Sequence, residues 1–412
     1  MKTLLMNIDS LVTVSADGSL SKTGSSMRDV GELTNAAMLF DERILWIGPT
    51  SEAKQHLSAD VEVVDCSGKT VMPGFVDSHT HMVFAGSRSG EFARRLAGAS
   101  YAEIAAEGGG ILTTMRAVRE ADVESLIDVG DALLTSALQH GTTTAEIKSG
   151  YGLDVESELR LLDAIGQLQL GHEARVVGTF LGAHAVPPEY KHDPEAYVNL
   201  VVNEMLPRVR EQGTASFCDV FVDAGFFAEA QGERILNAAR EHGLRLKIHA
   251  DEIALVGAST MAARVGCISA DHLEHSTITE IQALRDAGVV CTLLPGTAYT
   301  LRLPYPDART MIDEGAVVAL ATDCNPGSCF TENMQTILSL SCINMGMSIE
   351  EAIVASTLHG AAALGLANDL GSLEVGKFAD VVVYDVPSYK DIVYHFGVNH
   401  VWGVWVGGTE VS

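Results

Sequence analysis

The sequence predicts an α/β fold, a (β/α)8 TIM-like barrel with a small β-sandwich domain built from both chain termini. Three observations predict it. The middle of the chain alternates apolar, strand-like runs with helical patterns eight times. The two ends carry only short β-like runs. Nearly every notable polar residue falls at the C-terminal end of a predicted strand, where barrel enzymes build their sites.

Length and charge limit the function classes. The chain has 412 residues, enough for one large domain and a satellite. Its net charge of −27 argues against nucleic acid or anionic membrane as a partner, because phosphates would be repelled. A small anionic substrate would therefore need its own local basic residue. This makes each arginine near a candidate site informative.

Cysteine usage and the N-terminal stretch indicate a cytoplasmic protein. The 7 cysteines are scattered and contain no CxxC, which is typical of reduced thiols. Residues 1–14 contain an apolar stretch broken by polar residues, and no small-residue cleavage site follows. We interpret them as a strand rather than a signal peptide. No apolar run is long enough to span a bilayer.

The terminal β domain is expected from short strands at both ends. Candidate strands are 4–14, 37–49, 61–68, 378–386 and 400–411, and the Gly- and Ser-rich stretch 18–31 is a loop. We expect residues 1–72 and 371–412 to form this domain together and residues 73–370 to form the barrel.

The barrel strands and helices follow from the middle of the chain. Candidate strands are 74–81, 142–150, 175–184, 217–225, 245–252, 268–275, 289–297 and 317–327. Helical patterns at 123–141, 197–213, 233–243 and 278–288 all end in Gly, as helices often do. A doubly wound sheet is the alternative architecture. It would require a Gly-rich dinucleotide-binding loop directly after a strand, but GGGILTT at 108–114 follows no predicted strand.

Polar side chains end six of these strands. Residues at i and i+2 of a strand share a face, so His79 and His81 offer half of a metal site at the first strand end. The C-terminal ends of the other five strands carry Tyr151, His184, His249, Glu252, His272, His275, Asp323 and Asn325.

The predicted metal ligands are His79, His81, His249 and Asp323. Three imidazoles and one carboxylate suit Zn²⁺ or iron better than Mg²⁺ or Ca²⁺. The alternatives are a core histidine for His249 and a helix cap for Asp323. A bound metal would lower the pKa of its water to about 7 and polarise a carbonyl.

Two further residues are candidates for proton transfer. Glu252 lies on the loop above the metal, where it can hold the substrate or shuttle a proton. His272 is the candidate to orient the water or act as acid and base. Asp323 would share the proton with them, and we expect His275 to be structural.

The chain resembles the amidohydrolase superfamily and, more narrowly, the imidazolonepropionase family of histidine degradation. The matching motifs are HTHMVFAGSR, EFARRLAGASYAEIAAEGGGI, EIKSGYGL, FLGAHAVP, KIHADE, LLPGTAYTLR and ATDCNPGSCFTENMQ. That resemblance implies hydrolysis of the cyclic amide C–N bond of 4-imidazolone-5-propanoate to N-formimidoyl-L-glutamate. It also implies the metal ligands named above.

The resemblance assigns substrate contacts to Arg88, Tyr151, His184, Glu252, Asn325, Gly327 and Ser328. Arg88 offers a fork of donors to the propanoate. The loop from Asn325 to Ser328 can present backbone N–H groups to a carboxylate. Tyr151 and His184 could bond the ring nitrogens or the carbonyl, with His184 as a donor to the oxyanion. The plainer alternatives are a surface ion pair for Arg88, rim packing for Tyr151 and a simple turn for Gly327.

One metal per chain is expected, with zinc favoured and iron as the alternative. Binuclear relatives carry a carboxylated lysine at the end of strand four, and residues 217–225 contain none. The family more often has Cys-Glu where this chain has Val222 and Asp223, which leaves the role of Asp223 open.

Apolar exterior helices favour a homodimer. A nucleobase deaminase or a non-catalytic barrel scaffold are the other function classes.

Overall fold

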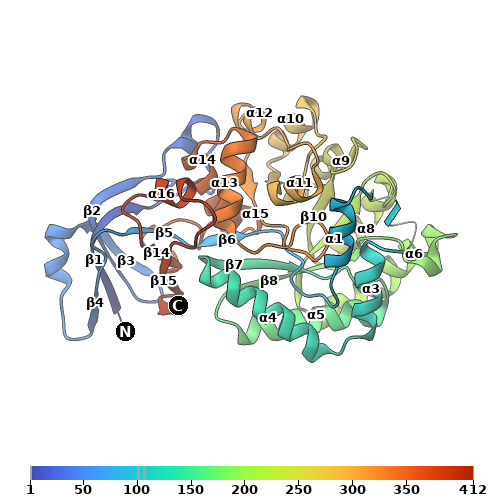
Figure 1. The fold of residues 1–412 in the computed structure, drawn as a ribbon, viewed down its shortest axis with the longest axis horizontal. Helices are drawn as coiled ribbons and strands as arrows, with labels where there is room; N and C mark the ends of the chain where they lie inside the picture. The colour runs from blue at the N-terminus through green and yellow to red at the C-terminus, as the bar shows by residue number, and fades with distance from the viewer. Residues whose placement is uncertain (1, 100–102, 105–107, 412) are drawn as a thin grey trace.

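A computed structural model of the protein describes residues 2–99, 103–104 and 108–411. Part of the motif at 91–111 lies outside these residues. Two eight-stranded sheets form the framework, one a barrel and the other a curled sheet at its side (Figure 1). Both parts of the predicted fold class are confirmed.

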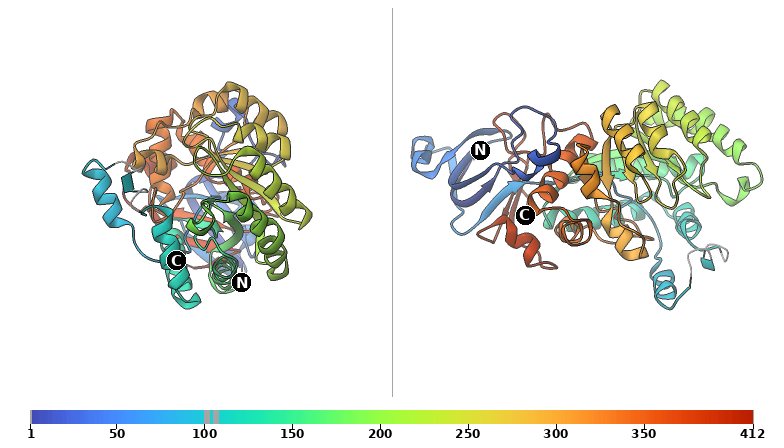
Figure 2. Two further views of the ribbon diagram at one scale, coloured as in Figure 1. Left: turned by 90° about the vertical axis from the view of Figure 1, so that its right-hand side faces the viewer. Right: turned by 90° about the horizontal axis from the view of Figure 1, so that it is seen from above.

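The barrel consists of eight parallel strands in sequence order. They are β6 (Phe75–Asp77), β7 (Thr142–Lys148), β8 (Arg175–Ala183), β9 (Ala215–Val222), β10 (Arg245–Ala250), β11 (Ser269–His272), β12 (Val290–Leu293) and β13 (Val318–Leu320). The strands are buried almost throughout because the surrounding helices cover them, as the end-on view in Figure 2 shows.

Aspartate side chains cap the N-termini of two long barrel helices, α4 and α5. The first are α1 (Ser89–Leu96), α3 (Ile111–Glu120), α4 (Val123–Gln139), α5 (Val155–Gly171), α6 (Pro194–Leu200), α7 (Leu206–Gln212) and α8 (Glu229–Glu241). At the start of α4, the carboxylate of Asp122 accepts a bond from the Ser125 N–H at 2.9 Å. Asp154 caps α5 in the same way, at 2.8 Å from the Ser157 N–H.

The predicted helix 197–213 is two α-helices joined by a π-helical turn over Val201–Met205. Pro207 lies in the first turn of the second helix and has no N–H to donate. A regular helix would require that donor, so the chain widens locally instead.

The second half of the barrel carries shorter helices. They are α9 (Ala258–Val265), α10 (Ile278–Ala287), α11 (Pro295–Leu301), α12 (Ala308–Asp313), α13 (Met334–Met345), α14 (Ile349–Ser356) and α15 (Leu358–Ala363). Helix α15 packs very closely on β6: a Cβ at Gly360 would lie 2.2 Å from the Val76 carbonyl oxygen. Only glycine allows this approach, which supports the strand that leads into His79.

The second sheet joins both ends of the chain. Its strand order is β16 (Thr409–Glu410), β15 (Val401–Val406), β14 (Val381–Tyr384), β5 (Thr70–Pro73), β1 (Lys2–Val12), β2 (Glu32–Phe40) and β3 (Ile44–Pro49), and β4 (Val61–Asp65) also pairs with β1. The segment 37–49, expected as one strand, turns between β2 and β3. Helix α16 (Tyr389–Tyr394) lies between β14 and β15.

The chain passes from this sheet into the barrel at Gly74. A side chain there would collide with Thr143, since a Cβ would lie 2.1 Å from its hydroxyl oxygen.

Among the described helices, none combines the length and apolar character that a membrane span requires.

Candidate active site

The barrel closes where the chain after β6 meets the chain after β13. The His81 N–H donates to the Cys324 carbonyl at 2.9 Å, and the Asp323 N–H donates to the His79 carbonyl at 3.0 Å. Below these bonds, the Thr322 hydroxyl and N–H both donate to Asp77, at 2.5 and 3.0 Å. The first and last strands of the barrel thereby bring three predicted ligands together.

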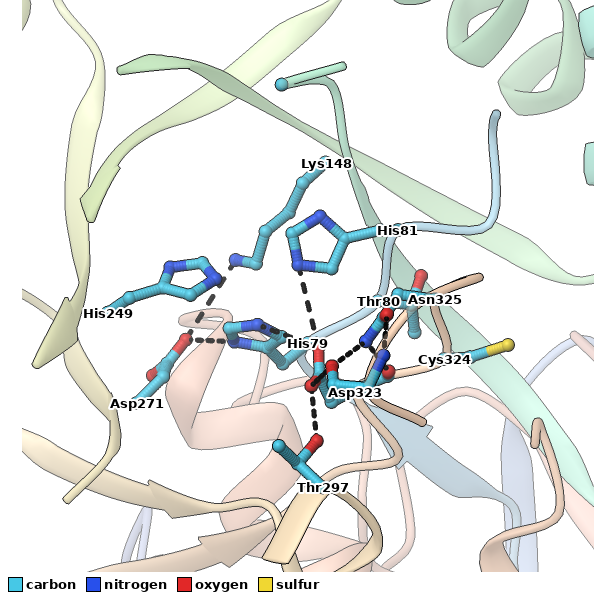
Figure 3. A network of polar contacts seen from close by, with 12 residues as sticks. His79, Thr80, His81, Lys148, His249, Asp271, Thr297, Asp323, Cys324 and Asn325 are labelled. Carbon is cyan, nitrogen blue, oxygen red and sulfur yellow. Dashed lines mark hydrogen bonds and ion pairs between the residues drawn. The ribbon is translucent and has the colours of Figure 1, made fainter. Parts of the chain in front are cut away.

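The four predicted metal ligands lie around one point (Figure 3). One carboxylate oxygen of Asp323 is 3.5 Å from Nε2 of His79 and 3.6 Å from Nε2 of His81. The ring of His249, at the end of β10, is centred 4.5 Å from that of His79 and 5.5 Å from that of His81. All four side chains are buried.

The chemistry of this cluster fits a metal ion. Two ligand atoms bonded to one ion at about 2.0–2.2 Å lie roughly 3.3 Å apart, close to the separations from Asp323. Nε2 of His79 is buried and has no hydrogen-bond partner among the described residues. Burial and neighbouring positive charges lower the pKa values of His79 and His81 well below the usual value, which keeps both rings neutral as metal binding requires.

His272 also lies close enough to be considered as a ligand. Atoms of His79, His249 and His272 lie within 4.8 Å of one another. However, the ring nitrogens of His272 are each 3.6 Å from a carboxylate, one on Glu252 and the other on Glu274. Burial alone would lower the pKa of His272, but these two carboxylates outweigh it and raise that pKa. A protonated ring has no lone pair for a metal, so this position suits proton transfer.

Glu252 is placed to exchange a proton with His272. Burial raises the pKa of Glu252, which favours the protonated carboxyl beside His272. Asp223 holds the loop that carries Glu252: its carboxylate accepts the N–H groups of Ile253 at 2.8 Å and Ala254 at 3.1 Å. Asp223, which is shorter than the glutamate more common in the family, therefore helps to fix the position of Glu252.

A cavity of about 380 Å³ opens above the ligands. Every predicted substrate-binding residue lines it: Arg88, Tyr151, His184, Glu252, Asn325, Gly327 and Ser328. His81, His249, His272 and Asp323 also face it. His275 is half-buried and does not line it, in agreement with a structural role.

The role predicted for His184 as an oxyanion donor is wrong in this geometry. Its Nδ1 is 3.0 Å from the Gly150 carbonyl, which can only accept, so Nδ1 carries the proton. Burial, with the nearby His249, lowers the pKa of His184 to about 3. A neutral ring protonated at Nδ1 presents Nε2 to the cavity as an acceptor, suited to an N–H group of a ligand.

The predicted anion-binding loop also works differently from expectation. The N–H groups of Gly327 and Ser328 both donate to the side-chain oxygen of Asn325, each at 2.8 Å, so they are already engaged. Gly327 matters for another reason: a Cβ there would lie 2.0 Å from a guanidinium nitrogen of Arg88. The loop gives Arg88 room, and Glu91 fixes it with a 2.8 Å bond to its Nε.

Sequence reasoning missed a group of charged residues inside the barrel, immediately beneath the ligands. They are Glu146, Lys148, Asp219, Lys247 and Asp271, all fully buried. Asp271 is 2.6 Å from Nδ1 of His79, and Asp219 is 3.1 Å from Nδ1 of His249. Strand alternation could have revealed three of them, since Lys247 shares a strand face with His249 and Glu146 shares one with Lys148.

Electrostatic pairing keeps Asp219 and Lys148 charged inside the barrel. Burial alone would raise the pKa of Asp219, but His249 and Lys148 hold that pKa well below its usual value. Likewise, burial disfavours a charged Lys148, yet Asp219, Glu146 and Asp271 raise its pKa above the ordinary range.

The chain is similar in sequence to a protein family and to individual proteins of known sequence. A family model described as "Amidohydrolase family" matches residues 70–411. The imidazolonepropionase of Geobacillus kaustophilus is 46% identical over 405 residues, covering 97% of this chain and 96% of its own. The imidazolonepropionase of Alkaliphilus metalliredigens is 46% identical over 411 residues, covering 99% and 97%.

Solved structures support the fold. An adenosine deaminase from Xanthomonas campestris with bound zinc superposes with a TM-score of 0.73 at 19% identity, covering 99% of this chain and 92% of that chain. The guanine deaminase of E. coli gives a TM-score of 0.75 at 16% identity, covering 100% and 99%. At such identities the likeness concerns the fold alone.

Replacement of His249 by alanine is expected to abolish metal retention, because it removes a neutral imidazole from the centre of the cluster. The measurement is metal content per chain after gel filtration, by mass spectrometry. The control is His275→Ala, a half-buried histidine outside the cavity, which should keep its metal. If His249→Ala retains full metal content, His249 is not a ligand.

Proposed function

The chain belongs to the amidohydrolase family, and on this premise we propose that it opens the ring of 4-imidazolone-5-propanoate by hydrolysis, giving N-formimidoyl-L-glutamate. It is a metal-dependent hydrolase of the imidazolonepropionase type, acting in histidine degradation. The observation that carries the proposal is the identity of 46% with imidazolonepropionases along almost the whole chain.

The metal would be held by His79, His81, His249 and Asp323. When bound, it supplies an activated water and polarises the carbonyl of the cyclic amide. We favour zinc over iron, because zinc combines these nitrogen and oxygen ligands with an open position for water. Buried imidazoles kept neutral, as in His79 and His81, support this assignment.

The residues around the metal would position the substrate and move the proton. Hydrolysis adds one water: its oxygen ends in a new carboxylate, the ring C–N bond breaks, and the released nitrogen takes a proton. Glu252 and His272 both line the cavity and lie 3.6 Å apart, so they would deliver the proton to that nitrogen. His184 would accept a ring N–H through Nε2, and Tyr151 would pack beside it, since the two rings are centred 5.3 Å apart.

Arg88 would bind the propanoate. Its side chain is buried in the cavity wall in a protein whose net charge is −27, so an anionic substrate finds its positive partner there. Glu91 orients the guanidinium and itself accepts the Thr113 hydroxyl at 2.9 Å, which ties α1 to α3. The remaining guanidinium nitrogens would form the fork that grips a carboxylate.

The test of this function is incubation of the purified, metal-loaded protein with 4-imidazolone-5-propanoate. We expect loss of the substrate absorbance and formation of N-formimidoyl-L-glutamate without release of ammonia. Removal of the metal with a chelator should stop the reaction, and adding the metal back should restore it. Release of ammonia from a nucleobase, with the imidazolone untouched, would identify a deaminase instead.

Arg88→Ala is expected to raise KM for the substrate by roughly tenfold or more, the equivalent of a charge-assisted hydrogen bond of about 1.5–3 kcal/mol. Steady-state kinetics measure it. Arg94→Ala, which removes an exposed arginine from α1, the helix that follows Arg88, is the matched control and should leave KM unchanged. An unchanged KM in Arg88→Ala would show that another group binds the carboxylate.

We further propose a cytoplasmic homodimer that binds neither nucleic acid nor membrane. All seven cysteines are free, which supports a reducing compartment. Several large apolar side chains are exposed near the C-terminal end of the chain, among them Ile343, Tyr394 and Phe396 at 72%, 82% and 67%. We expect sedimentation velocity to give twice the chain mass of 43.7 kDa. A monomer at micromolar concentration would contradict the dimer.

A further inference from the structure

Five charged side chains lie inside the barrel where most such folds place apolar residues. Glu146 and Lys148 come from β7, Asp219 from β9, Lys247 from β10 and Asp271 from β11, and none is exposed to solvent. Taking charges out of water costs free energy that pairing only partly returns. A purely structural interior would not need them, and their contacts indicate another role.

Lys148 is the residue that joins the three carboxylates. Its ammonium nitrogen is 2.7 Å from Glu146, 2.8 Å from Asp219 and 3.9 Å from Asp271. Lys247 contacts fewer of them: its ammonium is 2.6 Å from the Ser269 hydroxyl and 3.4 Å from Asp271. The two lysines are equally buried but differ in what they hold.

Two of the three carboxylates that Lys148 contacts, Asp219 and Asp271, bond the metal-binding histidines. One oxygen of Asp219 faces the ammonium, and the other accepts the backbone N–H of His249 and lies 3.1 Å from its Nδ1. One oxygen of Asp271 is shared between Lys148, Lys247 and Nδ1 of His79. Figure 3 shows Lys148 pointing from β7 towards Asp271, beside both rings.

The same region has the composition of a cation site. His79, Asp219 and Asp271 offer ligand atoms that lie within 4.8 Å of one another. Lys148 places its ammonium against two members of this set, at 2.8 and 3.9 Å. The protein thus fills this space with a positive charge of its own.

We propose that Lys148 is a positioning residue of the metal centre, whose ammonium fixes Asp219 and Asp271 and, through them, the rings of His249 and His79. This inference rests on the metal site of the proposed function. A carboxylate that bonds Nδ1 sets the ring orientation and leaves Nε2 free for the metal. Without the ammonium, the clustered carboxylates would repel one another and move apart. This movement weakens their hold on the histidines.

The test compares Lys148→Met with Lys247→Met, both loaded with Co²⁺. The measurements are the rate of metal loss to excess chelator and the visible absorption bands of the bound cobalt, which report ligand geometry. We expect Lys148→Met to lose metal at least tenfold faster than the wild type, with shifted cobalt bands, since changes to groups behind ligands typically cost about 10–100-fold in affinity. Lys247→Met should lose metal more slowly than Lys148→Met, because the Lys247 ammonium contacts only one of the two carboxylates that bond the histidines.

Two outcomes would overturn the proposal. Wild-type metal retention and cobalt bands in Lys148→Met would show that the ammonium does not act on the ligands. Equal effects in both variants would indicate a general loss of buried charge. If Lys148→Met does not fold, Lys148→Gln, which keeps hydrogen-bond donors but no charge, is measured in its place. A wild type that holds one metal yet leaves the imidazolone intact would refute the proposed reaction without affecting this inference.

Discussion

Closure of the barrel is the constraint on which the site depends. His79 and His81 follow the first barrel strand, whereas Asp323 follows the last, almost 250 residues later. Backbone bonds join these two segments directly at the ligands: the Asp323 N–H donates to the His79 carbonyl and the His81 N–H to the Cys324 carbonyl. The bonds that close the sheet are therefore also the bonds that set the ligand positions. A change that opens the barrel at this point would separate the ligands as well.

The interior below the ligands shows how a polar site is accommodated in a buried barrel. Carboxylates orient the imidazoles, and lysines offset the charge of the carboxylates. Each of these carboxylates contacts a histidine, and Lys148 in turn contacts the carboxylates. The metal ligands, Asp219 and Asp271, and the lysines thus form three successive levels. Above them, Glu252 and His272 line the cavity.

Much of this arrangement could be predicted from the sequence. The eight strands and the positions of His79, His81, His249 and Asp323 follow from periodicity and from the rule that barrel sites form at the C-terminal ends of strands. The barrel and the terminal sheet are confirmed, and the predicted ligands lie together.

What could not be predicted depends on long-range geometry. The donor role expected for His184 failed because its tautomer is set by the Gly150 carbonyl, 34 residues away. The N–H groups of Gly327 and Ser328 looked available from the sequence, but Asn325 uses both. Asp219 and Asp271 were overlooked because a single acidic residue in an apolar strand gives no sign of the histidine that it contacts across the barrel.

Anomalous diffraction from crystals of the metal-loaded protein, recorded on both sides of the metal absorption edge, tests the central claim most directly. The account predicts one peak per chain, about 2.0–2.2 Å from Nε2 of His79, His81 and His249 and from a carboxylate oxygen of Asp323. No peak among these four side chains, or a peak held by other residues, would contradict it.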